Sequence, residues 1–444
     1  MMKKTILLSI SLILLSALSL GAKEYTLTEY LDLVERNSKE LKLARQDLEI
    51  ADATKAEAVS GALPHVSAQA GYTRNLSDMY MYMDMGALTD DESAGTSKFP
   101  ITRNNEFSAY VTASQTLFSG AVYNAVRAAR QYRKLSDFVY DASYQEIITS
   151  AKKAFHQALL LRVVLEVTQA SQQNAYENYQ DVSKAFDNGL ASQFGLLQAE
   201  VRYKEMIPQT TEAERNYSIA LINLKNLAGI PLEEEIGLAG NLDAYPDLPT
   251  MKPLDAVLES RPDFNALLWE EKLRATNVSA EKSAFLPTLT GSLSYVFSSQ
   301  SDRWRFDEKN DNYTLGLTLS VPIFTGGATK AKVQKARIEL DRTRISIDRA
   351  RDMIELEQEN IRLRLEEAYN RIASAKAALT AAQKAFDIAE ATSKVGLSTQ
   401  LELKDSRTML DLATTGYYSA VYEYLDAYFD YEKSMGAAVS SASM

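Results

Sequence analysis

The segment of the chain that decides the fold is residues 313–330, which reads YTLGLTLSVPIFTGGATK. In its first half, from Tyr313 to Val321, apolar residues alternate with small polar ones. Because strand side chains point to opposite faces in turn, this alternation predicts a β-strand with one apolar and one polar face. The second half leads at once into residues 328–394, which contain no glycine and no proline. That stretch predicts a single helix of roughly 100 Å, at ~1.5 Å per residue.

The same unit occurs earlier in the chain. Residues 117–120 (Leu-Phe-Ser-Gly) correspond to residues 323–326 (Ile-Phe-Thr-Gly), and a long segment without glycine or proline follows in both places. Further upstream, residues 31–64 correspond to residues 254–287, which lie 223 positions later. The chain therefore consists of two copies of one supersecondary unit in the same order.

This repeat predicts the limits of the domains and elements. The first repeat covers residues 23–228, with a helix, two strands (66–74 and 107–118), a long helix (121–187) and a further helix (193–227). The second repeat covers residues 254–435, with a helix, two strands (288–297 and 313–324), a long helix (328–394) and a further helix (398–435). Proline-rich residues 229–253 are expected to form an equatorial linker, and residues 436–444 a C-terminal tail. Gly120, Gly326 and Gly327 lie at the strand-to-helix joints. They are expected to adopt backbone angles that would be strained for any residue type other than glycine.

Residues 1–22 have the pattern of a signal peptide, with a basic start, an apolar run from Ile6 to Leu20 and small residues after it. We therefore expect an exported protein. The chain has no Cys, which excludes disulfides and a cysteine for a lipid anchor. Its net charge of -11 argues against nucleic-acid binding, which needs a basic surface.

The four predicted strands fit two environments, a half-buried sheet in water or a membrane barrel with lipid outside and water inside. Three features favour the barrel. The strands are near the ~9–11 residues that a tilted membrane strand needs, aromatic residues lie near their ends, and the polar face is mostly Ser, Thr, Gly and Gln. Four strands cannot close a barrel, since the smallest known barrels have about eight, so the chain must oligomerise.

In the order and spacing of these motifs, the chain resembles the TolC-type outer-membrane factor family over essentially its whole mature length. The resemblance implies a mixed, mainly α fold, the tandem-repeat protomer of a trimeric 12-stranded outer-membrane β-barrel continued by a long periplasmic α-helical barrel. It implies a homotrimer in the lipid of the cell outer membrane that extends into the periplasm. The implied function is a passive exit duct of a tripartite efflux or type I secretion system. A periplasmic adaptor (membrane fusion) protein and an inner-membrane RND or ABC transporter would open it at its helical tip.

Under this resemblance, two helix–turn–helix tips become adaptor-docking sites. The first consists of Asn188, Gly189, Leu190, Ala191 and Ser192, and the second of Val395, Gly396, Leu397, Ser398 and Thr399. From the residues alone, each glycine is an ordinary helix C-cap in the left-handed conformation. The two interpretations are compatible, because the glycine makes the turn that a partner would contact.

Glu402 and Asp405 follow the second tip at a spacing that places them on one helix face. The resemblance implies a pore gate in which three copies place six carboxylates around one constriction. Such a ring would favour cations and raise the pKa of some carboxylates by mutual repulsion. The alternative is a solvated charged face, because Lys404 lies between the two acids.

The first repeat carries a longer insertion at residues 75–106, where Met79, Met81, Met83 and Met85 share one strand face. Thioethers suit Cu(I) or Ag(I), which makes these residues weak metal candidates, and the alternative is a flexible apolar extension of the barrel. No other metal and no cofactor is predicted.

An enzyme is not expected, because the only two histidines, His65 and His156, are far apart and no Cys could act as a nucleophile. The alternative function is a non-conducting periplasmic coiled-coil structural or adhesive protein. A receptor role would rest on the insertion at residues 75–106.

Overall fold

The computed structural model describes residues 23–84, 95–395 and 397–436. The predicted signal peptide, Met85, Gly396 and tail residues 437–444 lie outside the described residues. The chain divides into two compact units. A helical unit contains residues up to Asp47, Asp137–Ala266 and the chain from Ile347 onward, and a strand-bearing unit contains Leu48–Ser136 and Leu267–Ser346.

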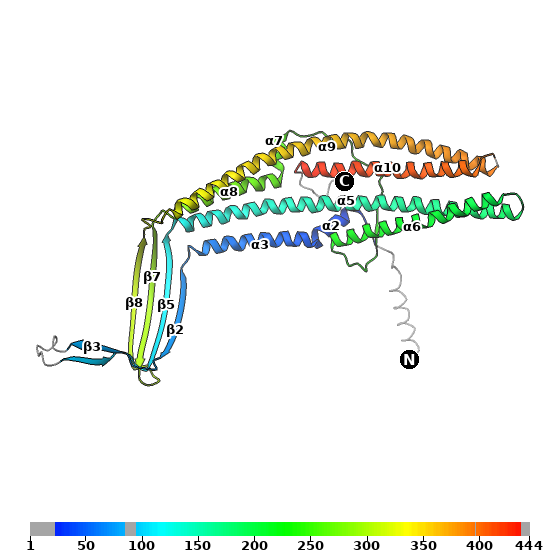
Figure 1. The fold of residues 1–444 in the computed structure, drawn as a ribbon. Coiled ribbons are helices and arrows are strands. Elements are labelled where there is room, and N and C mark those ends of the chain that lie inside the picture. The colour runs from blue at the N-terminus through cyan, green and yellow to red at the C-terminus, as the bar shows by residue number, and fades with distance from the viewer. Residues whose placement is uncertain (1–22, 85–94, 396, 437–444) are drawn as a thin grey trace, which may run out of the picture. The chain divides into compact units, whose positions relative to one another are not determined.

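The strand-bearing unit is built on one antiparallel four-stranded sheet (Figure 1). Its strands are β2 (His65–Arg74), β5 (Asn105–Phe118), β7 (Thr288–Ser301) and β8 (Glu308–Ser320), in the order β2-β5-β7-β8. The strands of the two repeats therefore form one continuous sheet. Among the described residues, β2 and β8 each pair on one side only, which leaves two open edges.

The register places the apolar residues of all four strands on one face of the sheet. Ala68 pairs with Val111, Val111 with Tyr295, and Tyr295 with Tyr313. Side chains on this face are open to solvent in the single chain, and Leu315 is 82% exposed. The alternation seen in the sequence is thus confirmed as a two-faced sheet.

Several strand limits differ from those expected, and β7 ends at Ser301 where the sequence predicted residue 297. Strand β8 begins at Glu308 because its polar start pairs with the last part of β7, where Gln300 lies opposite Glu308. It ends at Ser320, so the prediction that it continues to Phe324 is wrong. Pro322 explains this end, because proline has no N–H to donate to a neighbouring strand.

The insertion forms a hairpin of its own. Strands β3 (Tyr80–Asp84) and β4 (Thr96–Pro100) pair with each other in a separate two-stranded sheet. Within the described part of the chain, the insertion therefore does not extend the strands of the four-stranded sheet.

Four long helices follow the predicted limits closely. They are α5 (Gly120–Asp187), α6 (Gln193–Ala228), α9 (Ala328–Lys394) and α10 (Gln400–Ser434). Helix α10 begins at Gln400 and not at Ser398, because Thr399 acts as its N-cap. None of the described helices is both long and apolar enough to span a membrane.

The first helix of each repeat is broken, where the sequence predicted one element. Helix α2 (Leu27–Asn37) gives way to α3 (Lys39–Ser60) at Ser38, and α7 (Leu254–Ser260) gives way to α8 (Pro262–Ser283) at Arg261. These break residues lie 223 positions apart, which is the spacing of this part of the repeat, and both are buried. The break is therefore a property of the repeated unit.

The linker at residues 229–253 is more ordered than expected. Strand β6 (Ile236–Leu238) pairs in parallel with β1 (Lys23–Tyr25) at the start of the described chain. The guanidinium of Arg162 on α5 donates hydrogen bonds to the carbonyl oxygens of Leu238 and Gly240. The linker is thus fixed to the helical core, which includes Phe155, Leu224 and Tyr424.

Candidate functional site at the helical turns

The first tip is closed by a glycine in the left-handed conformation. Gly189 has φ +72°, its N–H donates to the carbonyl oxygen of Phe186 at 2.9 Å, and the Leu190 N–H donates to Ala185 at 2.7 Å. This pair of bonds satisfies the last carbonyls of α5. Ser192 then caps α6 by accepting a hydrogen bond from the N–H of Gly195 at 3.1 Å.

The second tip repeats this geometry 207 residues later. The Leu397 N–H donates to the carbonyl oxygen of Thr392 at 2.9 Å, matching the bond between Leu190 and Ala185. Thr399 caps α10, as Ser192 caps α6. Gly396, the counterpart of Gly189, lies outside the described residues.

Glu402 takes part in capping the start of α10 at the second tip. Its carboxylate accepts a hydrogen bond from the Thr399 N–H at 2.7 Å, and its own N–H donates to the Thr399 hydroxyl oxygen at 3.2 Å, which forms a capping box. The carboxylate also accepts a hydrogen bond from the Ser398 hydroxyl at 3.1 Å. The bonds from Thr399 and then Ser398 hold the pKa of Glu402 below its ordinary value. Gly195 occupies the matching position in the first tip, so only the second tip carries this carboxylate.

Asp405 lies exposed on α10, one turn beyond the exposed Glu402. The predicted shared face is thus present in the single chain. A ring of six carboxylates would require three copies and stays a prediction, as does any pKa rise from their repulsion. In the single chain the pKa of Glu402 is shifted in the opposite direction.

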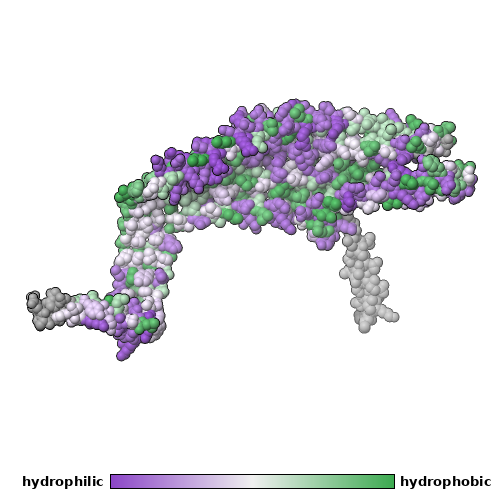
Figure 2. All heavy atoms as spheres, in the orientation of Figure 1, coloured by the Kyte–Doolittle hydropathy of each residue, from purple (hydrophilic) through white to green (hydrophobic). Residues whose placement is uncertain are grey.

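Large apolar side chains are exposed at both tips (Figure 2). Leu190 is 84% exposed and its counterpart Leu397 is 81% exposed. Phe194 and Leu401, which are also 207 residues apart, are exposed as well. A hollow of about 350 Å³ lies between the tips, with Phe194 and Leu401 in its lining. Exposed apolar patches of this kind are typical of protein-binding surfaces.

A partly buried polar link, which the sequence did not predict, lies away from the tips along the helices. Ser171 on α5 donates a hydrogen bond to Asp411 on α10, and Arg407 pairs with Asp411 at 3.0 Å and with the Ser171 oxygen at 3.2 Å. Burial raises the pKa of Asp411, and the contacts with Ser171 and Arg407 oppose that rise without cancelling it. This link joins the α5–α6 hairpin to the α9–α10 hairpin. The spacing of Arg407 and Asp411, i and i+4 on one helix, was the only local sign of it.

The three predicted joint glycines have two different roles. Gly326 (φ +63°) and Gly327 (φ +83°) adopt the left-handed conformation, as expected. Gly120 does not, so the prediction of a strained backbone there is wrong. A Cβ on Gly120 would lie 2.6 Å from the Cβ of Ser283, so this glycine permits a close approach between α5 and α8.

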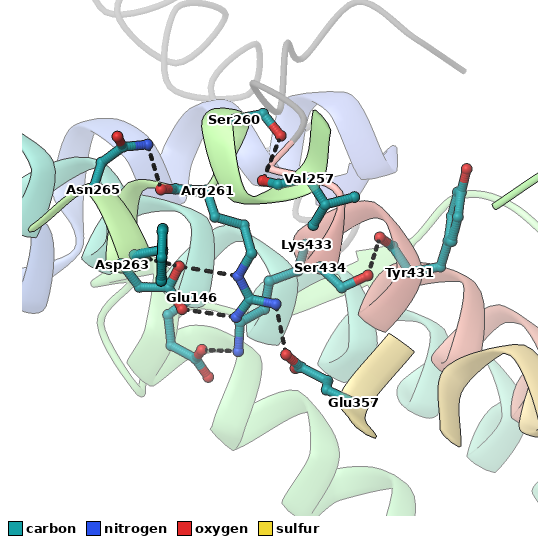
Figure 3. A network of polar contacts seen from close by, with 11 residues as sticks. Glu146, Val257, Ser260, Arg261, Asp263, Asn265, Glu357, Tyr431, Lys433 and Ser434 are labelled. Carbon is teal, nitrogen blue, oxygen red and sulfur yellow. Dashed lines mark hydrogen bonds and ion pairs between the residues drawn. The ribbon is translucent and has the colours of Figure 1, made fainter. Parts of the chain in front are cut away.

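A second polar network surrounds the break between α7 and α8 (Figure 3). Arg261 donates hydrogen bonds to Asp263 at 2.7 Å and to Glu357 of α9 at 2.6 Å. The Ser260 hydroxyl donates to the carbonyl oxygen of Met435 at 2.8 Å. The break thereby connects α9 and the end of α10.

The methionine candidates are only partly described. Met79 and Met81 are exposed, and Met83 lies on the same face of β3, opposite Ser97. Among the described residues, no group of three or more His, Cys, Asp or Glu could hold a metal ion. Thioether coordination therefore stays a prediction.

Comparison with known proteins adds a family match. A model described as outer membrane efflux protein matches residues 30–230 and 254–437. The alkaline protease secretion protein AprF of Pseudomonas aeruginosa is 24% identical over 265 residues, covering 58% of this chain and 55% of AprF. The outer membrane protein TolC of Escherichia coli K12 is 23% identical over 351 residues, covering 76% of this chain and 66% of TolC. The chain thus spans about half to two thirds of the length of these relatives.

Solved structures with the same fold are outer membrane channels. The Campylobacter jejuni CmeC channel matches with a TM-score of 0.77 and 20% identity, covering 94% of this chain and 87% of CmeC. The open state of the Neisseria gonorrhoeae MtrE channel matches with a TM-score of 0.73 and 20% identity, covering 92% of this chain and 88% of MtrE. At these identities the likeness establishes the fold.

Proposed function

Because the chain belongs to the outer membrane efflux protein family, we propose that it forms a passive exit duct in the outer membrane for efflux or type I secretion. The family is one of channel proteins, and we propose no enzymatic activity for this chain. The adaptor and the inner-membrane RND or ABC transporter are partners in this proposal.

The observation that carries the proposal is the four-stranded sheet with its open apolar face. Leu315, Leu317 and Leu319 of β8 all lie exposed on one side, and small polar residues such as Thr314 and Ser320 lie on the other. A face of this kind is stable against lipid, while the polar face suits a wet lumen. Open strand edges are a liability in an isolated sheet. Pairing β8 of one copy with β2 of the next would remove both edges, and three copies would close a barrel of 12 strands.

The tips support the docking part of the proposal. The two turns share one backbone hydrogen bond, from Leu190 to Ala185 and from Leu397 to Thr392, and they expose leucines at matched positions. One adaptor surface could therefore recognise both turns. Glu402 and Asp405, present only at the second tip, would line the entrance and favour cations.

The experiment is solute release from vesicles that contain the purified protein in one orientation. A small fluorescent dye should leave when the link at Arg407 is removed by Arg407→Ala, and a large dextran should be retained. The purified protein should also run as a trimer in detergent. A monomer that releases no dye, with or without the substitution, would favour the non-conducting rod.

A further inference from the structure

We propose that the hairpin of β3 and β4 carries a binding site for a soft monovalent cation, Cu(I) or Ag(I), formed by the thioether sulfurs of Met79, Met81 and Met83. The inference goes beyond the proposed function, because it depends on this hairpin alone and on no property of the duct.

Backbone pairing places the three methionines on one face of the hairpin. Met81 lies opposite Phe99 in the register of β3 and β4, and Met83 is two residues further along β3. The carbonyl oxygen of Met79 accepts a hydrogen bond from the Ile101 N–H at 2.9 Å, which continues the same pairing beyond Tyr80. Alternate residues of a strand point to the same side, so the three methionines are neighbours there. Together with Phe99 they form the methionine face.

Neighbouring sulfurs on the methionine face can reach one ion. Alternate residues of a strand lie about 7 Å apart, at ~3.3–3.4 Å per residue. Methionine is unbranched and has three rotatable bonds, so two such side chains can turn their sulfurs toward an ion held between them. Met79 and Met83 are separated by twice that distance. Met81 is therefore the residue common to both possible sulfur pairs.

The chemistry of the methionine face suits a soft cation. Thioether sulfur selects ions such as Cu(I), whereas carboxylate, carbonyl and water oxygens suit Mg²⁺ and other hard cations. Phe99 lies directly across from Met81, where cross-strand Cβ atoms are about 4.5–5.5 Å apart. An aromatic ring beside a bound cation adds an electrostatic attraction and limits its contact with water.

Charged groups near the hairpin are held on its opposite face. The Lys98 ammonium lies 3.6 Å from the centre of the Tyr80 ring. The Tyr80 hydroxyl donates a hydrogen bond to the Asp78 carboxylate at 3.2 Å. Tyr80 lies between Met79 and Met81 in the strand, so its side chain points away from the methionine face. The ammonium that would repel a metal cation is thus kept on the other side.

Exposure distinguishes the methionine face from a packed core. Methionine commonly fills gaps between buried side chains. Here Met79 is 61% exposed, Met81 44% and Phe99 40%. Among the described residues, β3 and β4 pair only with each other, so no further strand extends the hairpin. Four of the 12 methionines of the chain nevertheless occur at alternate positions of residues 79–85. Metal binding accounts for both the exposure and the spacing.

Titration calorimetry with silver nitrate, in a chloride-free buffer with detergent, tests the site. Met85 lies outside the described residues and is changed to Leu in every protein compared, so that only the described methionines differ. The Met85→Leu reference should bind Ag(I) saturably. Met81→Leu should lose this binding, because it removes both sulfur pairs while conserving volume. Met79→Leu and Met83→Leu should each keep weaker binding, because one pair remains.

Two control substitutions lie outside the hairpin. Met353→Leu, on α9, removes a methionine that is 58% exposed and has no methionine two residues away, and it should bind Ag(I) like the reference. His65→Gln removes an exposed imidazole and should also leave binding unchanged. Magnesium nitrate, the hard-cation probe, should give no heat that depends on Met81.

Three outcomes would overturn the inference. Equal Ag(I) binding by the reference and by Met81→Leu would show that the ion is held elsewhere. Loss of binding in His65→Gln would assign the ion to an imidazole. A reference protein without saturable binding would leave the methionine face as an apolar surface only. The proposed duct is unaffected by each of these outcomes, because dye release from vesicles measures it separately.

Discussion

Gly436 lies so close to Ser260 that a Cβ built on the glycine would be 2.5 Å from the Ser260 carbonyl oxygen. Gly229 has the same relation to Asn37, where that distance would be 2.9 Å. In both repeats, the glycine that follows the last helix packs against the residue that ends the first short helix. The two repeats therefore share this tertiary contact as well as their sequence pattern.

Substitution of these glycines should destabilise the protein. Gly436→Ala and Gly229→Ala each force a side chain into a left-handed backbone and against a carbonyl group, at a cost of roughly 1–3 kcal/mol from the backbone alone. The measurement is the midpoint of thermal unfolding. Gly416→Ala is the matched control, because it lies inside α10 with open space around it and should stabilise by up to about 1 kcal/mol. Equal midpoints for all three variants would contradict this account.

Stability should fall as the pH drops below about 6.5, the ordinary pKa of histidine. Burial lowers the pKa of His156, and the nearby Lys152 charge lowers it further against the opposing hydrogen bond to the Lys152 carbonyl oxygen. The groups that face it are Lys152, paired with Glu432, and the Phe429 ring. Below pH 6.5 the unfolded chain therefore binds more protons than the folded protein does. The stability that comes from the neutral, buried His156 is complete above that pH and is lost as the pH falls below it.

The unfolding midpoint at pH 7.5 and pH 5.5 tests this effect. His156→Leu, which copies the repeat counterpart Leu363, should show a smaller fall in midpoint than the parent. His65→Gln should keep the fall of the parent. An unchanged fall in His156→Leu would assign the pH dependence to other groups.

Loss of the link between the hairpins should favour an open tip. Arg407→Ala leaves the partly buried Asp411 without its cation, and a loss of about 1.5 kcal/mol in the closed state would raise the open-to-closed ratio roughly tenfold. Single-channel recording of open time measures this ratio. Asp181→Asn, in an exposed pair with Lys184, is the control and should leave it unchanged. If both variants behave like the parent, other contacts hold the tips.

Much of the fold could be predicted because its signals are local. Alternation identified the strands, and the absence of glycine and proline identified α5 and α9 to within one residue. The turn at Gly189 could be predicted because a glycine between two helices commonly ends the first helix in the left-handed conformation. The Thr399–Glu402 spacing is a capping-box signature, so the capping role of Glu402 could also have been predicted from the sequence.

Features that depend on distant parts of the chain were missed. The pairing of β1 with β6 involves three residues on each strand, too few for a periodic pattern. The Ser171–Asp411 link joins residues on different hairpins, and nothing near Ser171 signals its partner. The break at Arg261 depends on Asp263 and on Glu357 of α9, whose contact only the tertiary fold creates.

The most direct test of the duct and its acidic entrance is the reversal potential of single channels in a KCl gradient across a planar bilayer. The parent should be compared with Glu402→Gln/Asp405→Asn, because glutamine can keep the capping box while removing the charge. We expect cation-selective openings in the parent and a loss of that selectivity in the variant. Folded trimers that never conduct, even with Arg407→Ala, would contradict the claim that the chain forms a duct.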